Sequence, residues 1–181
     1  MIVSRGNYGI GLIALALVLA MALVGPGWTQ TATPPAPEQA KLYGQAVSLL
    51  EQAQQQLTTG NLSAALALVK QSNELFTLLQ KECASVLAER QLAPKDEQQV
   101  AINQKLAADA QAQADQLLPA AAAKKKQAQD LQAQGQAEAG DTVLRASREA
   151  YLQVQNLSIK SAIYALRNQQ IIFGFLAPSS P

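Results

Sequence analysis

The sequence contains no histidine and only one cysteine, Cys83. The absence of histidine removes the commonest general base of enzymes, the serine–histidine pair of hydrolases and the commonest metal ligand. A single thiol can form neither an internal disulfide nor a zinc cluster. Cys83 falls on the apolar stripe of an expected helix, so we interpret it as a small buried side chain. We therefore expect no enzyme activity, no catalytic residue, no metal ligand and no cofactor.

Other chemical motifs are also missing. No glycine-rich phosphate-binding loop is present, because apart from Gly44 the glycines gather in the N-terminal segment and in expected turns. Glu82 and Glu89 are seven residues apart and would share a helix face, but a carboxylate-bridged metal site would also need Glu-x-x-His motifs. We interpret these carboxylates as part of a solvated face.

The chain has no excess of charge of either sign. It has 14 Lys and Arg, of which Arg5 lies in the N-terminal segment, so 13 remain against 13 Asp and Glu. A nucleic-acid-binding protein would need a basic surface, so we expect no nucleic-acid partner. The run Lys124–Lys126 is the one basic cluster in the sequence, and it is more typical of a solvated helix surface than of a binding site.

Aromatic residues make up only 4% of the chain, whereas about a fifth of it is Ala and about one in seven residues is Gln. Alanine, glutamine, leucine, lysine and glutamate favour helices, while strands are rich in β-branched and aromatic residues. No long stretch alternates apolar and polar residues with a period of two. The composition therefore predicts an all-α protein.

The first 28 residues have the pattern of a signal peptide or a membrane anchor. Arg5 is the only charged residue before Glu38, and an apolar run over Ile10–Val24 is followed by the helix-breaking sequence Gly25–Gly27. Residues 8–28 are also long enough to cross a bilayer. Both alternatives leave Arg5 in the cytoplasm and export the rest of the chain. In a bacterium or a cyanobacterium, the exported part would lie in the periplasm or in the thylakoid lumen.

The remaining chain is expected to form one helical domain over residues 38–176. Three prolines in residues 29–37 indicate an extended tether between membrane and domain, and residues 177–181 are expected to be a disordered tail. Apolar residues recur every three or four positions in four segments. The predicted helices are 38–58, 62–91, 95–134 and 142–173.

Short turns should join these helices into two antiparallel hairpins. Gly60 can end the first helix, Pro94 can begin the third, and residues 135–140 form the last turn. Pro119 should kink or split the third helix. Four long amphipathic helices then pack as a four-helix bundle or as a coiled-coil-like pair of hairpins. Their unequal lengths predict either that one end protrudes or that the long helices bend.

One hairpin carries the spacing of a known repeat. Large, small and turn residues stand at Leu49, Ala53, Gly60, Asn61, Ala65, Val69 and Ser72. Through them, residues 46–79 resemble one tetratricopeptide repeat, although Gln56 stands where that family usually has a tyrosine. A weaker echo starts at Gly140. The resemblance covers about a fifth of the chain and implies a helical hairpin within a protein-binding scaffold.

The C-terminal end is unusually apolar. Two of the three phenylalanines and three large aliphatic residues lie close together there: Ile171, Ile172, Phe173, Phe175 and Leu176. This segment either caps the core of the bundle or docks on a partner or membrane. We favour the cap and keep the docking patch as the alternative.

These features together predict an interaction or assembly protein, exported or membrane-anchored, with no catalytic activity of its own. Its expected partners are other membrane or exported proteins, and its N-terminal segment would contact the membrane. The alternative is a helical bundle that binds a lipid or another apolar ligand between alanine-rich helices, which pack closely but bury little area per residue.

Overall fold

The computed structural model describes residues 37–177, so the predicted signal or anchor and nearly all of the tether lie outside the described residues. This part of the chain is all-α, as predicted, and has no strand. None of its helices is both long enough and apolar enough to cross a membrane. Its elements are α1 (Pro37–Thr58), α2 (Leu62–Glu82), α3 (Ala84–Glu89), α4 (Pro94–Ala133), α5 (Ala137–Ile172) and a short 3₁₀ helix, η1 (Gly174–Leu176).

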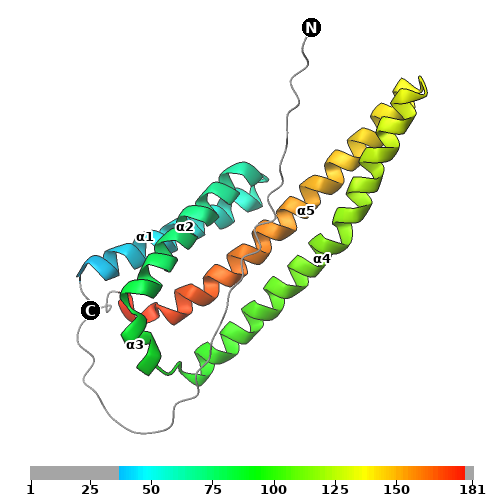
Figure 1. Ribbon diagram of the computed structural model, residues 1–181. Coiled ribbons are helices and arrows are strands. Elements are labelled where there is room, and N and C mark those ends of the chain that lie inside the picture. Colours follow the sequence, from blue (N-terminus) through cyan, green and yellow to red (C-terminus); the bar gives the residue numbers. More distant parts are fainter. Residues whose placement is uncertain (1–36, 178–181) are drawn as a thin grey trace.

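The long helices form two antiparallel hairpins, α1–α2 and α4–α5, which confirms the predicted arrangement (Figure 1). The C-terminal half of α5 packs against both α1 and α2, while α4 packs against α5 alone. Helix α5 therefore joins the two hairpins. Because α4 and α5 are the longest helices, their far ends extend past the α1–α2 pair as an arm (Figure 1).

Both hairpins turn at a glycine in the left-handed region. Gly60 has φ of 79° and Gly135 has φ of 78°, values that favour a residue without a Cβ. At each turn the glycine N–H donates to a carbonyl three residues back, and the next N–H donates to one five residues back. This is the Schellman arrangement, which satisfies the last carbonyls of a helix. The two turns are thus closed by the same hydrogen bonds.

The start of α5 differs from the prediction. The turn is confined to residues 134–136 and α5 begins at Ala137 rather than near residue 142, so Gly140 lies inside the helix and Asp141 is not its cap. The physical reason is a close approach between helices. A Cβ on Gly140 would lie 3.0 Å from the Ala128 carbonyl oxygen and 2.6 Å from Cγ of Gln132. Glycine is therefore placed here by packing against α4, and not by a turn.

The two hairpins also share a buried side-chain hydrogen bond at equivalent positions. The hydroxyl of Ser72 donates to the Ala46 carbonyl at 2.9 Å, and that of Ser147 donates to the Ala121 carbonyl at 2.9 Å, with a sequence separation of 26 in each case. When the two hairpins are aligned on their turn glycines, Gly60 and Gly135, Ser72 aligns with Ser147 and Ala46 aligns with Ala121. In this alignment of the two hairpins, the turn glycine Gly135 is the counterpart of Gly60.

The hydrophobic core lies where α5 meets the α1–α2 hairpin. Phe76 is at its centre, with its ring 6.5 Å from Tyr43 in an edge-on arrangement and 6.0 Å from Phe173 in a stacked one. Aromatic pairs at these separations stabilise a core beyond the area that they bury. The aliphatic side chains around them are fully buried or nearly so: Leu50, Val69, Leu79, Ile159, Ile163, Leu166 and Leu176.

The predicted helix 62–91 is divided at Cys83, which separates α2 from α3. Cys83 is buried, as expected. Beyond it the chain changes direction, so Val86 does not continue the buried stripe and is 49% exposed. The new direction brings Arg90 against the C-terminal segment. Its guanidinium donates to the Ile172 carbonyl and lies 4.6 Å from the centre of the Phe175 ring.

Helix α4 continues through Pro119 without a break, so the proline does not split it. In Figure 1, α4 changes direction along its course toward the arm. Its contact with α5 is made mainly by small residues, since four of its five buried apolar side chains are alanines: Ala110, Ala114, Ala121 and Ala128. Small side chains let the two helices approach closely but bury little apolar area.

Candidate functional site

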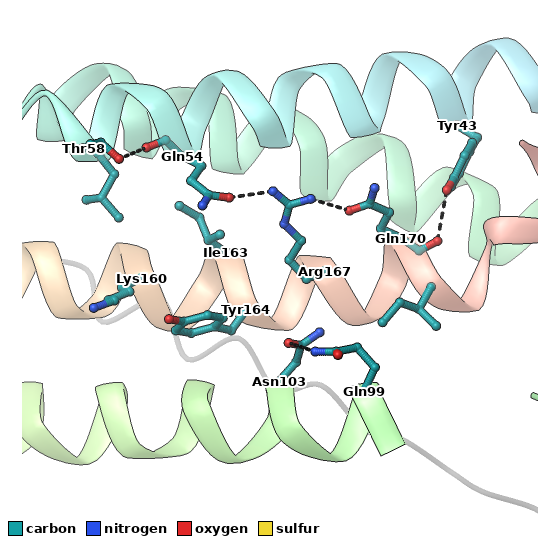
Figure 2. A pocket seen from close by; sticks show the side chains of 12 residues that line it. Tyr43, Gln54, Thr58, Gln99, Asn103, Lys160, Ile163, Tyr164, Arg167 and Gln170 are labelled. Carbon is teal, nitrogen blue, oxygen red and sulfur yellow. Dashed lines mark hydrogen bonds between the residues drawn. The ribbon is translucent and has the colours of Figure 1, made fainter. Parts of the chain in front are cut away.

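A groove runs along α5 between α1 and α4. It exists because α1 and α4 both pack on α5 without contacting each other. Its volume is about 670 Å³, and twelve residues from the three helices line it (Figure 2). Helix α5 forms its floor. All but three of the lining side chains carry a hydrogen-bonding group, the exceptions being Leu57, Ile163 and Ile171. This groove is the principal candidate for a binding site in the described part of the chain.

Arg167 is the central charged group of the groove. Its side chain reaches from α5 toward α1, where one terminal nitrogen donates to Oε1 of Gln54 at 2.6 Å and the other donates to Oε1 of Gln170 at 2.8 Å (Figure 2). Both acceptors are neutral amide oxygens. The guanidinium is therefore held in place, while its charge stays uncompensated and its other N–H groups remain available.

A second cation and a tyrosine lie on the same face of α5. Lys160 and Tyr164 precede Arg167 by seven and three residues and lie on the α4 side of the groove (Figure 2). No Asp or Glu is among the residues that line the groove. Within residues 37–177, the one salt bridge is between Lys105 and Asp109, outside the groove. The groove is therefore locally positive although the whole chain is close to neutral.

The α4 wall of the groove presents amides. Gln99 donates through Nε2 to Oδ1 of Asn103 at 3.1 Å, one helical turn away. Asn103 is only 6% exposed, so this hydrogen bond keeps a buried polar group satisfied. Gln99 is exposed and can contact a bound group without disturbing the core.

Tyr43 closes one end of the groove and also belongs to the core. Its hydroxyl donates to the Gln170 carbonyl at 3.1 Å, which ties α1 to α5. Burial raises the pKa of Tyr43 above its ordinary value of 10.0, and the nearby positive charge of Arg90 opposes that shift. Burial disfavours the phenolate, which would place a negative charge in the core.

This raised pKa predicts a loss of stability in alkali. The unfolded chain releases the tyrosine proton near pH 10, whereas the folded chain retains it to higher pH, so the free energy of unfolding should fall as pH rises through that interval. Tyr43→Phe should make the fall shallower while lowering stability at neutral pH by about 1 kcal/mol through the lost hydrogen bond. Urea unfolding at a series of pH values would measure both effects. An unchanged slope in the variant would show that another group titrates.

The remaining predicted residues lie apart from the groove. The three lysines of Lys124–Lys126 are exposed on α4 toward the arm. Cys83 is buried at the α2–α3 junction. Its burial raises the pKa of the thiol, and the negative charge of Glu82 raises it further. Residues 37–177 contain no cluster of acidic and cysteine side chains that could hold a metal ion.

The C-terminal apolar segment lies at the end of the core. Phe173 and Leu176 are fully buried, and Ile172 and Phe175 are partly buried and pack against the core. Ile171 lines the end of the groove. The segment thus contributes two side chains to the interior of this chain and three that keep some exposure.

Comparison with known proteins adds no relative to this description. No protein-family model matches the chain, and no curated protein or solved structure matches it significantly. The resemblance of residues 46–79 to a tetratricopeptide repeat therefore stays a prediction.

The sequence did not indicate the groove. Its polar residues come from three helices that are far apart in the chain, such as Gln54, Gln99 and Arg167. Each of them alone is an ordinary polar residue on a helix. One signal was available, because Arg167 directly follows the apolar run 163–166, and a charged side chain beside a buried stripe has to find polar neighbours.

Proposed function

We propose that this chain is an exported or membrane-anchored assembly protein that binds a partner protein in the groove between α1 and α4 and has no catalytic activity of its own. The observation that supports this most directly is an open groove with hydrogen-bonding side chains on its floor and on both walls. A segment bound there would contact α1, α4 and α5 at once and bridge the two hairpins.

The chemistry of the lining favours a protein partner over the alternative of a lipid or another apolar ligand. An acyl chain would leave Arg167, Lys160 and Gln99 without water and without new hydrogen bonds, which costs free energy for each group. A polypeptide segment offers backbone and side-chain partners to all of them. The predicted resemblance of residues 46–79 to a protein-binding repeat agrees with this choice.

Filling the groove should abolish partner binding without changing the charge of the chain. Gln99→Trp places a large side chain on the exposed α4 wall, and we expect it to reduce the recovery of a stoichiometric partner at least tenfold. Gln113→Trp, at an exposed position of α4 outside the groove, is the matched control. The full chain would be purified from native membranes in a mild detergent, and bound proteins would be quantified by mass spectrometry.

Two outcomes would contradict the proposal. The first is that no stoichiometric partner accompanies the unaltered chain. The second is that the Gln99 and Gln113 variants lose the partner equally, which would place the interface elsewhere on α4. Circular dichroism of both variants would establish that each keeps the helical content of the unaltered chain.

A further inference from the structure

The charge of the groove specifies the partner further than its shape does. Arg167 donates to two neutral amide oxygens, and Lys160 is exposed at the same groove. Neither cation forms a salt bridge within residues 37–177. A cation held in position and lacking a counter-ion is suited to receive an anionic group, and the planar guanidinium matches a carboxylate with two parallel hydrogen bonds.

The spacing of the two cations sets the spacing of the anions. Lys160 and Arg167 are seven residues apart on α5, which corresponds to about two helical turns and a separation of about 10 Å along the axis. Tyr164 lies between them, and its phenol adds a hydrogen-bond donor on the α4 side (Figure 2). Helix α5 therefore offers one donor directed toward α1, from Arg167, and two donors on the α4 side of the groove, from Lys160 and Tyr164.

We propose that the groove binds an acidic segment of the partner protein and that Arg167 and Lys160 each receive one of its carboxylates. This inference rests on the proposed function, because it names the chemistry of the partner that occupies the groove. The amides of Gln99 and Gln54 then lie on either side of the segment, where they can bond to its backbone. Two carboxylates about 10 Å apart would engage both cations together.

The test uses the full chain in a non-ionic detergent and a fluorescent peptide with Glu at every third position and Gly elsewhere, which spaces the carboxylates of an extended chain about 10 Å apart. We expect this peptide to bind, and the uncharged peptide with Gln in place of Glu to bind at least tenfold more weakly. Arg167→Gln should weaken binding of the Glu peptide about tenfold or more. Arg148→Gln, an exposed arginine of the same helix outside the groove, removes the same charge and should leave the affinity unchanged.

Two further variants keep the test decisive if Arg167→Gln lowers stability. Lys160→Gln changes an exposed residue, so it should fold normally and weaken binding several-fold, because it removes one of two charge contacts. Arg167→Lys keeps the charge but loses the planar fork, and should bind with an affinity between those of the unaltered chain and Arg167→Gln. Added salt should weaken the binding of the Glu peptide.

Several results would overturn the inference. Equal losses for Arg148→Gln and Arg167→Gln would show that only the general charge matters. Full competition by free glutamate or inorganic phosphate would indicate a small-anion site, and Arg167-dependent binding to vesicles of phosphatidylglycerol and phosphatidylcholine without peptide binding would indicate a membrane surface. If the Gln99→Trp variant loses a partner while the Glu peptide does not bind, the groove binds a protein of different chemistry and only this inference fails.

Discussion

Replacing Phe76 with alanine should lower the free energy of unfolding by about 3–5 kcal/mol. Phe76 is 2% exposed and packs between the rings of Tyr43 and Phe173, which belong to α1 and to the end of α5. Its removal would leave a cavity at the point where both hairpins meet and would end two aromatic contacts. Since small domains are stable by only about 5–15 kcal/mol, this loss is a large fraction of the total.

The matched control for Phe76 is Leu78→Ala. Leu78 lies on the same helix and is 41% exposed, so its truncation removes little buried area, and we expect a change of about 0.5 kcal/mol. Both variants would be compared by urea unfolding of the full chain in a mild detergent, followed by circular dichroism. Equal losses for the two variants would contradict the position of the core between α5 and the α1–α2 hairpin.

A methyl group at Gly140 should destabilise the arm by about 1–2 kcal/mol, although alanine is the better helix former. The added Cβ would meet two backbone atoms of α4, the Ala128 oxygen at 3.0 Å and the Gln132 nitrogen at 3.3 Å. It would also displace the Gln132 side chain, which donates to Asp141 at 2.9 Å. The tips of α4 and α5 would have to separate to make room.

Gly44→Ala is the control, and we expect it to change the free energy of unfolding in the opposite direction. Gly44 is an exposed helical glycine of α1, and a Cβ there meets no atom within 4 Å. Alanine should therefore stabilise the chain by about 0.5–1 kcal/mol, because it restricts the unfolded backbone and favours the helix. Hydrogen exchange of the amides in the arm would measure the local effect at Gly140, and thermal unfolding would measure the global effect at Gly44. A gain in protection at Gly140 would refute the close contact.

The two glycines show what sequence patterns can and cannot distinguish. Both lie in helices, and nothing in the residues next to them separates an open site from a close helix contact. The sequence placed both Gly135 and Gly140 in a turn ahead of a helix capped by Asp141, whereas of the two only Gly135 has the positive φ of the turn. Whether a helical glycine is open or in close contact depends on the distance to the neighbouring helix. At Gly140 this is the distance between α4 and α5, where the backbone of Ala128 lies opposite.

The groove was beyond sequence reasoning for a related reason. Periodicity reveals which face of a helix is buried, but it does not reveal which other helix covers that face. Arg167 became a candidate binding residue only when α5 placed it beside Gln54 of α1, 113 residues away in the chain. The C-terminal apolar segment was recognised from its composition, and its division into buried and half-exposed side chains depended on how η1 folds back onto the core.

The sequence by itself determined the helical class, the four long helices and their pairing into two hairpins. Local propensity and apolar spacing are sufficient for these features, because they act between residues three or four positions apart, and short turns leave antiparallel packing as the available geometry. The tertiary structure decided the break at Cys83 and the groove beside Arg167. Both depend on contacts between helices distant in the chain, and the periodicity of one helix does not reveal which other helix it meets.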